Sequence, residues 1–195
     1  MKQKSLTARH CICLLFLAGS VLLTRMTFLP PLAVAAGPPT FIVNSPADVV
    51  DANPGDGKCE TAHNNGVCTL RAAIMEANRA TGSTILFGLP GAVTYKLSIA
   101  PVTGPNNQIT GDLDISNTMT IVGNGAANTI IDANNIDRVF FVWPCIDNQY
   151  DQQTGACTIG LVAATISGVT IQNGRTSNFG PAGGGIFSQG GADAQ

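Results

Sequence analysis

Three aspartates in the second half of the chain have the residue type and spacing that acid–base chemistry needs. Asp112 and Asp114 alternate in "GDLDI", and Asp132 ends the run "NTIID". On a strand, residues i and i+2 project from the same face about 7 Å apart. Glycoside hydrolysis uses two carboxyl groups about 5–10 Å apart. The spacing of Asp112 and Asp114 is therefore compatible with a polysaccharide-active site.

The residues around these aspartates favour a structural interpretation instead. Asp at the end of a strand, before Gly or Asn, is common turn chemistry. A lyase needs a basic proton acceptor on a neighbouring strand, and Arg138 and Arg175 are the only basic residues after position 100. The only histidine beyond the first 36 residues is His63, in a turn-rich segment far upstream. We therefore predict no catalytic residue and no cofactor, and the three aspartates are the residues to test if the chain is an enzyme.

An oxygen-rich turn segment, "ADVVDANPGDG", carries the side chains that calcium prefers. Its four candidate ligands are Asp48, Asp51, Asn53 and Asp56. Their spacing does not match the EF-hand loop, which needs a D-x-[DN]-x-[DN]-G start and a distal glutamate. We favour polar turn chemistry without an ion and keep calcium as the weaker alternative.

Four cysteines lie beyond residue 36, and an even number in an exported chain predicts disulfides. They are Cys59, Cys68, Cys145 and Cys157. Proximity favours Cys59–Cys68 and Cys145–Cys157, each closing a loop of about ten residues and worth roughly 2.5–3 kcal/mol. A zinc site is the competing interpretation, but neither pair has CxxC spacing. The sequence alone leaves the connectivity open.

A polar insert, "WPCIDNQYDQQTGAC", interrupts the strands and contains two aromatic residues, Trp143 and Tyr150. Aromatic side chains on a rigid surface can stack on sugars or anchor a protein partner. The alternative, which we favour for Trp143, is that it covers the end of the preceding strand "RVFFV".

The first 36 residues have the order of a secretory signal peptide. A basic start precedes an apolar run over residues 11–23, and a small-x-small cleavage site follows at residues 33–35. We predict a secreted or cell-surface protein with no membrane span after signal removal; a retained anchor is the alternative. The remaining chain has six basic and twelve acidic residues, a formal net charge of −6. This charge argues against nucleic acid as a partner.

One segment, "CTLRAAIMEAN", has the pattern of an amphipathic helix, which we predict over residues 69–80. Its apolar side is expected to pack against the strands that follow. That side consists of Leu70, Ala73, Ile74 and Ala77. Arg71 is expected to pair with a carboxylate or to bind backbone carbonyls of the neighbouring strand. Glu76 is expected on the outer face of the helix.

Short apolar strands that end in Gly, Asn or Asp fill the rest of the chain. In "MTIVG", "NTIIDA" and "RVFFV", the residues Ile121, Ile130 and Val139 are nine positions apart at each step. This spacing predicts a mainly-β fold, a parallel β-helix in which each coil stacks on the previous one. A β-sandwich is the alternative, because Asn124-Gly125 is a typical hairpin turn.

The segment "FIVNSPADVVDANPGDGKC", followed by "GVCTLRAAIMEAN", resembles the N-terminal module named CSLREA after its motif. Cys68, Leu70, Arg71 and Ala73 match that motif, whereas Thr69 replaces its serine. Its glutamate is also replaced, by an alanine, so any ion pair that this glutamate makes in relatives is in doubt. Such modules precede right-handed parallel β-helix repeats in large exported bacterial proteins. The resemblance therefore implies a right-handed β-helix with one short capping helix at its N-terminal end.

These observations predict a signal peptide over residues 1–36, a capping module over 37–83 and β-helix coils over 84–195, truncated at the C-terminus. The expected function is a non-catalytic, adhesin-like scaffold that presents loops to surface glycans or proteins. An open end of the β-helix would also permit self-association. The alternative is the N-terminal part of a polysaccharide-active enzyme, either pectate-lyase-like or a glycoside hydrolase.

Overall fold

Short strands make up most of the regular structure of the chain. The computed structural model describes residues 37–102, 110–143, 161–176, 183–188 and 192–194, all within the unit Ala36–Gln195. The elements are β1 (Thr40–Val43), α1 (Leu70–Ala77), β2 (Ser83–Phe87), β3 (Val93–Lys96), β4 (Leu113–Ile115), β5 (Met119–Val122), β6 (Thr129–Asp132), β7 (Phe140–Val142), β8 (Val162–Ser167), β9 (Thr170–Gln172), β10 (Ile186–Ser188) and β11 (Ala192–Ala194).

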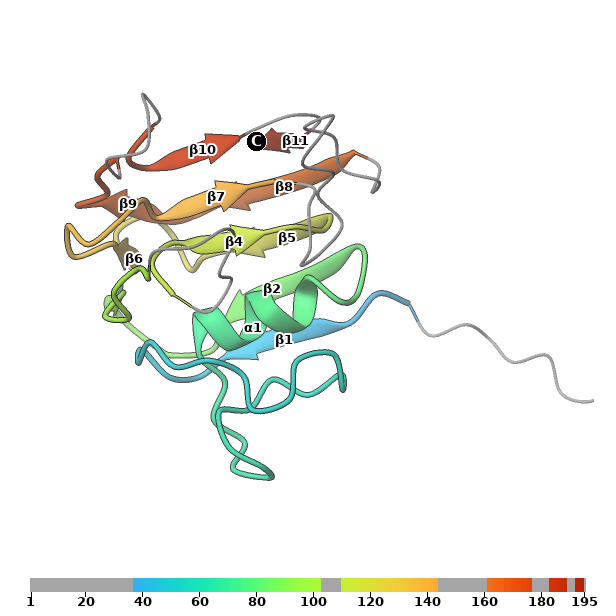
Figure 1. Cartoon of the computed structure of the whole chain (residues 1–195). Coiled ribbons are helices and arrows are strands. Elements are labelled where there is room, and N and C mark those ends of the chain that lie inside the picture. The colour runs from blue at the N-terminus through green and yellow to red at the C-terminus, as the bar shows by residue number, and fades with distance from the viewer. Residues whose placement is uncertain (1–36, 103–109, 144–160, 177–182, 189–191, 195) are drawn as a thin grey trace, which may run out of the picture. The chain divides into compact units, whose positions relative to one another are not determined.

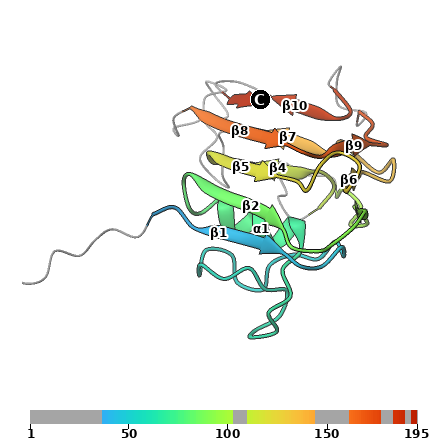
Figure 2. The same cartoon turned by 180° about the vertical axis from the view of Figure 1, so that it is seen from behind.

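The described strands pair into three sheets, and all of their pairings are parallel. Sheet A has the order β1-β2-β5-β8-β11, sheet B β3-β6-β9 and sheet C β4-β7-β10. From β2 onward the chain passes through sheets A, B and C in turn and then repeats that order (Figure 1 and Figure 2). The prediction of a mainly-β chain with one short helix is confirmed. The strands β5 and β6, which flank Asn124-Gly125, belong to different sheets and do not form a hairpin.

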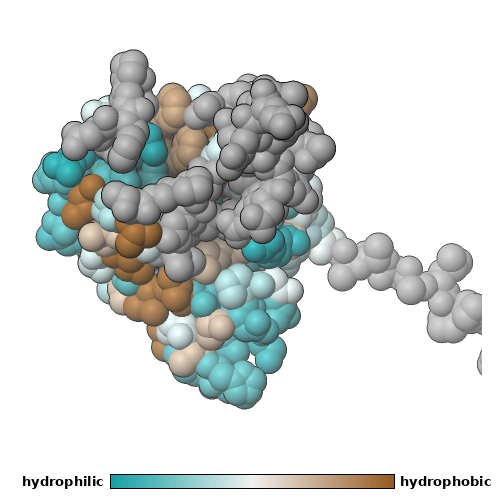
Figure 3. Space-filling view, viewed as in Figure 1, coloured by the Kyte–Doolittle hydropathy of each residue, from teal (hydrophilic) through white to brown (hydrophobic). Residues whose placement is uncertain are grey.

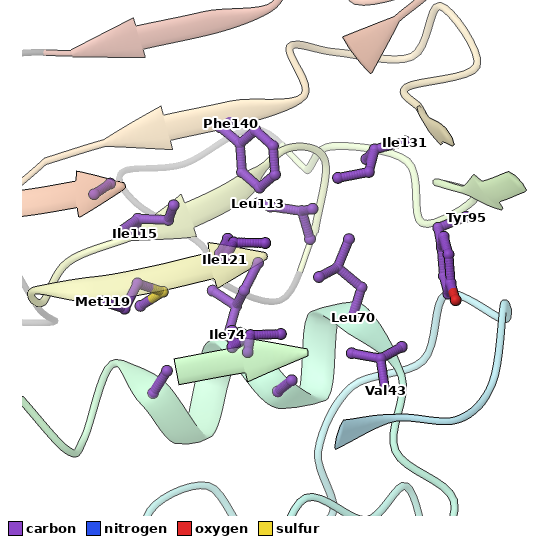
Figure 4. Close-up of a cluster of buried hydrophobic side chains, with 14 of the residues drawn as sticks. Val43, Leu70, Ile74, Tyr95, Leu113, Ile115, Met119, Ile121, Ile131 and Phe140 are labelled. Carbon is purple, nitrogen blue, oxygen red and sulfur yellow. The ribbon is translucent and has the colours of Figure 1, made fainter. Parts of the chain in front are cut away.

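Buried side chains at matching positions of successive strands form one hydrophobic core. In sheet A the buried row includes Phe41, Ile85 and Ile121, and in sheet C Leu113 lies beside Phe140. Figure 4 shows part of this cluster between the strands and α1. Full burial of such a side chain is worth about 1.5–3 kcal/mol. The alternation of apolar inward positions with more polar outward ones therefore fixes which face of each strand points inward.

The helix α1 contributes to this core and contacts β1, β2 and β4. Its four predicted apolar residues, Leu70, Ala73, Ile74 and Ala77, all belong to the core cluster. Thr69 is the N-cap, and its hydroxyl accepts a hydrogen bond from the amide of Ala72 at 3.1 Å. The helix is shorter than predicted because Asn78 ends it: the Asn78 side chain donates to the carbonyl of Asp114 at 2.8 Å and accepts from the amide of Ser116 at 2.9 Å.

All eight residues of α1 are buried, which corrects the expectation that Glu76 lies on an outer face. The segment between β1 and α1 covers that side of the helix; it forms the lower part of Figure 1, with a mostly hydrophilic surface in Figure 3. The Glu76 carboxylate accepts hydrogen bonds from the amides of Gly55 and Gly57 at 2.5 and 2.9 Å. Both glycines have positive φ, 98° and 81°, a conformation that other residues rarely adopt.

Ile74→Asp is expected to destabilise the whole described unit by at least about 3 kcal/mol, because it places a carboxylate in the apolar core. Urea unfolding followed by circular dichroism measures this change. The matched control is Ile42→Asp, at a position that is 55% exposed, where the expected cost is below about 1 kcal/mol. Equal unfolding midpoints for the two variants would show that α1 does not close the core.

Candidate ligand-binding face

Three side chains at equivalent positions of β4, β7 and β10 form a row on the outer side of sheet C. The register pairs Asp114 of β4 with Phe141 of β7, and Phe141 with Phe187 of β10. The two phenylalanine rings stack with centroids 5.5 Å apart and planes at 12°. Parallel strands that pair without a register shift place equivalent side chains about 4.8 Å apart, so aromatic residues at one position stack along the sheet.

Two further side chains extend this row into a cluster. The ring of Trp143 stacks on that of Phe141, with centroids 5.4 Å apart and planes at 29°. The guanidinium carbon of Arg138 lies 4.8 Å from the centroid of Phe141 and 5.5 Å from that of Phe187, which is cation–π geometry. All four side chains are half-buried. We call Arg138, Phe141, Trp143 and Phe187 the aromatic face.

Two carboxyl groups border the aromatic face. Arg138 Nε donates to Asp112 Oδ2 at 2.8 Å, and Asp114 lies next to Phe141 in the register. Burial raises the pKa of the Asp112 carboxyl, and the hydrogen bond from Arg138 opposes that rise. Burial, reinforced by the negative charge of Asp112, raises the pKa of Asp114 well above its ordinary value. Asp114 therefore keeps its proton at a higher pH than an ordinary aspartate and can donate a hydrogen bond.

Arg71 holds the strand that carries these carboxyl groups against the segment before α1. Its Nε and Nη2 donate to the two carboxylate oxygens of Asp48, at 2.6 and 3.2 Å. Its Nη1 and Nη2 also donate to the carbonyls of Asp112 and Gly111, at 3.0 and 2.8 Å. Only 1% of Arg71 is exposed. Arg71 therefore positions the start of β4 and does not reach a ligand.

The four calcium candidates have other partners. Asp48 binds Arg71 and also accepts from the amides of residues 98 and 99. Asp51 accepts from the amides of Asn53 and residue 60, and Asp56 accepts from the Asn53 side chain. In the described residues, no group of three or more His, Cys, Asp or Glu side chains is placed to hold a metal ion. Asp51, Asn53 and Asp56 therefore order the turns of the segment before α1, whereas Asp48 joins that segment to α1 and to the chain after β3.

A disulfide joins Cys59 to Cys68, with Cα atoms 5.0 Å apart, which is the pairing that proximity favoured. Cys68 directly precedes the N-cap of α1, so the bridge fixes the start of the helix to the preceding turn. Cys145, Cys157 and Tyr150 lie outside the described residues. Trp143 follows β7 directly, and its ring stacks on Phe141 as part of the aromatic face.

The third aspartate of the sequence analysis, Asp132, is on sheet B and so does not join Asp112 and Asp114 on sheet C. Burial alone would raise the pKa of Asp132. Hydrogen bonds from the amide of Asn134 and from the side chains of Gln172 and Asn173 outweigh burial and lower it. Asp132 therefore stays ionised to a lower pH than an ordinary aspartate, and it joins the turn that follows β6 to Gln172 of β9 and to Asn173 directly after it.

Comparison with known proteins adds no further evidence on this site. No protein-family model, curated protein or solved structure matches the chain. Within the ranges that the structure describes, no helix has the length and apolar character needed to cross a membrane.

Asp114→Asn is expected to change how stability depends on pH. Because the pKa of Asp114 is higher in the folded state than in the unfolded chain, the folded state binds more protons between these two values. The free energy of unfolding contributed by this group therefore falls as pH rises from about 3.8 through the raised folded pKa. Asparagine removes this fall, so the variant should be more stable than the parent at neutral pH.

Urea unfolding at pH 4 and pH 7 measures the effect. The contrasting variant is Asp132→Asn, because a lowered pKa contributes stability that is present at neutral pH and lost on acidification. Asp132→Asn should therefore be less stable than the parent at pH 7. A parent and an Asp114→Asn variant with the same pH profile would contradict the raised pKa of Asp114.

Proposed function

We propose that this chain is a non-catalytic, adhesin-like scaffold of the right-handed parallel β-helix class, secreted or at the cell surface, which binds glycans through the aromatic face. The observation that carries the proposal is the in-register stack of Phe141 and Phe187, with Trp143 and Arg138 packed against it. Proteins are the second class of ligand proposed for the same face.

The order of the strands supports the β-helix part of this proposal. From β5 onward, each strand pairs with the strand that occupies the same sheet one passage earlier, as stacked coils require. The resemblance of residues 41–78 to the CSLREA module supports an exported protein with its cap at residues 37–83 and its coils at 84–195. The disulfide of the cap agrees with an oxidising compartment.

The aromatic face has the chemistry of a glycan site. Sugars present C–H faces that pack on aromatic rings, and their hydroxyl groups bond to charged side chains such as Arg138. Phe141 and Phe187 project from paired strands, and Trp143 follows one directly. Side chains on strands lose little conformational freedom on binding, so the cost of ordering the site is small.

Phe141→Ala and Trp143→Ala are each expected to weaken glycan binding by roughly 2 kcal/mol, about thirtyfold in Kd, because they remove central aromatic contacts. An array of neutral and acidic oligosaccharides identifies a ligand, and calorimetry with that oligosaccharide measures Kd. The control is Thr94→Ala, an exposed residue on the outer side of sheet B, which should leave Kd unchanged. Equal Kd values for all three variants would place the glycan site elsewhere.

A polysaccharide-active enzyme is the second candidate, and one observation favours it. Asp114 has a pKa raised well above normal, whereas Asp112 is ion-paired with Arg138. Neighbouring carboxyl groups whose environments separate their pKa values are suited to the roles of general acid and base.

The enzyme hypothesis predicts release of reducing ends from at least one member of a polysaccharide panel. Asp112→Asn and Asp114→Asn should each abolish that release, because each removes a carboxyl group of the pair. Asp132→Asn, on sheet B, should retain it. If the parent chain is folded and inactive on the whole panel, the non-catalytic scaffold stands; activity that survives both sheet C substitutions would come from another site.

A further inference from the structure

The outer side of sheet A carries two rows of side chains that no part of the proposed function uses. The strands β1, β2, β5 and β8 pair in register, so that one outward position is threonine in all four strands and the next is aliphatic in three of them. The first row is Thr40, Thr84, Thr120 and Thr165; the second is Ile42, Leu86, Val122 and Ser167.

Both rows are accessible. Side chains alternate along a strand, and the residue between the two rows on each strand points into the core. Ile85 and Ile121 are fully buried, whereas Ile42 is 55% and Val122 36% exposed. Thr40 and Thr165 are exposed and the two central threonines are half-buried. Figure 2 shows these four strands one above another with α1 behind them. Among the described residues, no hydrogen bond involves the hydroxyl groups of the four threonines.

The four strands of this face differ from the other two sheets in their lack of charge; β11, the fifth strand of sheet A, contains Asp193, which pairs with Ala163 of β8. None of the four strands contains Asp, Glu, Lys or Arg. By contrast, the outer side of sheet B carries Lys96 and Asp132, and that of sheet C carries Asp114. The face also lacks the aromatic and arginine side chains that dominate protein hot spots and sugar platforms. The outer face of these four strands of sheet A is therefore complementary in its chemistry to an uncharged, repetitive ligand.

The backbone sets the dimensions of the array. Neighbouring parallel strands lie about 4.8 Å apart, and positions i and i+2 of one strand lie about 7 Å apart. The threonine hydroxyls and the methyl groups of both rows therefore repeat in two directions on a rigid support. A lattice of water molecules offers matching hydrogen-bond partners at comparable repeats, and rigidity lets many weak contacts form together with little ordering cost.

We propose that this threonine–aliphatic face of sheet A binds ice. The threonine hydroxyls hydrogen-bond to ordered water, and the methyl groups of both rows hold the neighbouring water molecules in place. The proposal is independent of the glycan site, which is on sheet C. A second copy of the chain is the competing occupant, because an exposed apolar row is also a surface for self-association.

The purified chain is tested for thermal hysteresis and for inhibition of ice recrystallisation in a buffered sucrose solution. Both activities are expected in the parent chain. Thr84→Tyr and Thr120→Tyr, in the centre of the array, should abolish them because a bulky ring holds the face away from the lattice. Thr94→Tyr, on the exposed outer side of sheet B, should retain them. Circular dichroism establishes that each variant is folded.

Loss of both activities in the sheet A variants alone would support ice binding by this face. A folded parent chain without either activity would overturn the proposal, as would full activity in both sheet A variants. Sedimentation velocity tests the competing occupant: dimers of the parent that disappear in Thr120→Tyr, without ice activity, would assign the face to a second copy. Thr84→Tyr and Thr120→Tyr are expected to leave glycan binding by sheet C unchanged. Failure of the ice-binding proposal is therefore distinguishable from failure of the glycan-binding proposal.

Discussion

The in-register stacking of parallel strands is the constraint on which the rest of the structure depends. Because β4, β7 and β10 pair without a shift, whatever side chain occupies an outward position is placed beside its equivalent on the next strand. This brings Phe141 and Phe187 into a stack although they are far apart in the chain. The same rule aligns the inward residues, so a single register determines both the core and the surface rows.

A stack of this kind needs a defined first layer, and buried polar groups provide it here. Arg71 joins the carboxylate of Asp48 to two backbone carbonyls before β4, and Glu76 binds the amides of Gly55 and Gly57. Removing one partner of a buried ion pair leaves an uncompensated charge, which typically costs about 3–5 kcal/mol. These hydrogen bonds and ion pairs are directional, so they fix the position of the segment before α1 relative to the helix. The apolar contacts of α1 supply most of the stabilisation.

The sequence was sufficient to predict the mainly-β class and the helix with its buried apolar side, because each depends on local spacing. Proximity favoured the Cys59–Cys68 pairing, but only the structure selects it from the possible connectivities. It was not sufficient for Glu76, since a helical pattern cannot show that the segment between β1 and α1 folds over the outer side of the helix. The stack of Phe141 and Phe187 was also missed. The stack forms only because the number of residues between β7 and β10 returns the chain to sheet C in register. The pattern of apolar residues within each strand does not give that number. The sequence "RVFFV" was a signal only for a strand.

The three sheets leave each outer surface free to carry a different chemistry on one core. Inward residues such as Ile121 and Phe140 are fully buried, and their outward neighbours make no contribution to that packing. A substitution at an outward position of sheet A therefore alters one row of an uncharged face, while the acidic and aromatic cluster on sheet C is unchanged. Because the backbone repeat of about 4.8 Å is common to all three sheets, what distinguishes their outer surfaces is the residue type at the outward positions of each strand. Such a surface offers an equivalent contact on each strand, which is the geometry that an extended, repetitive ligand would need.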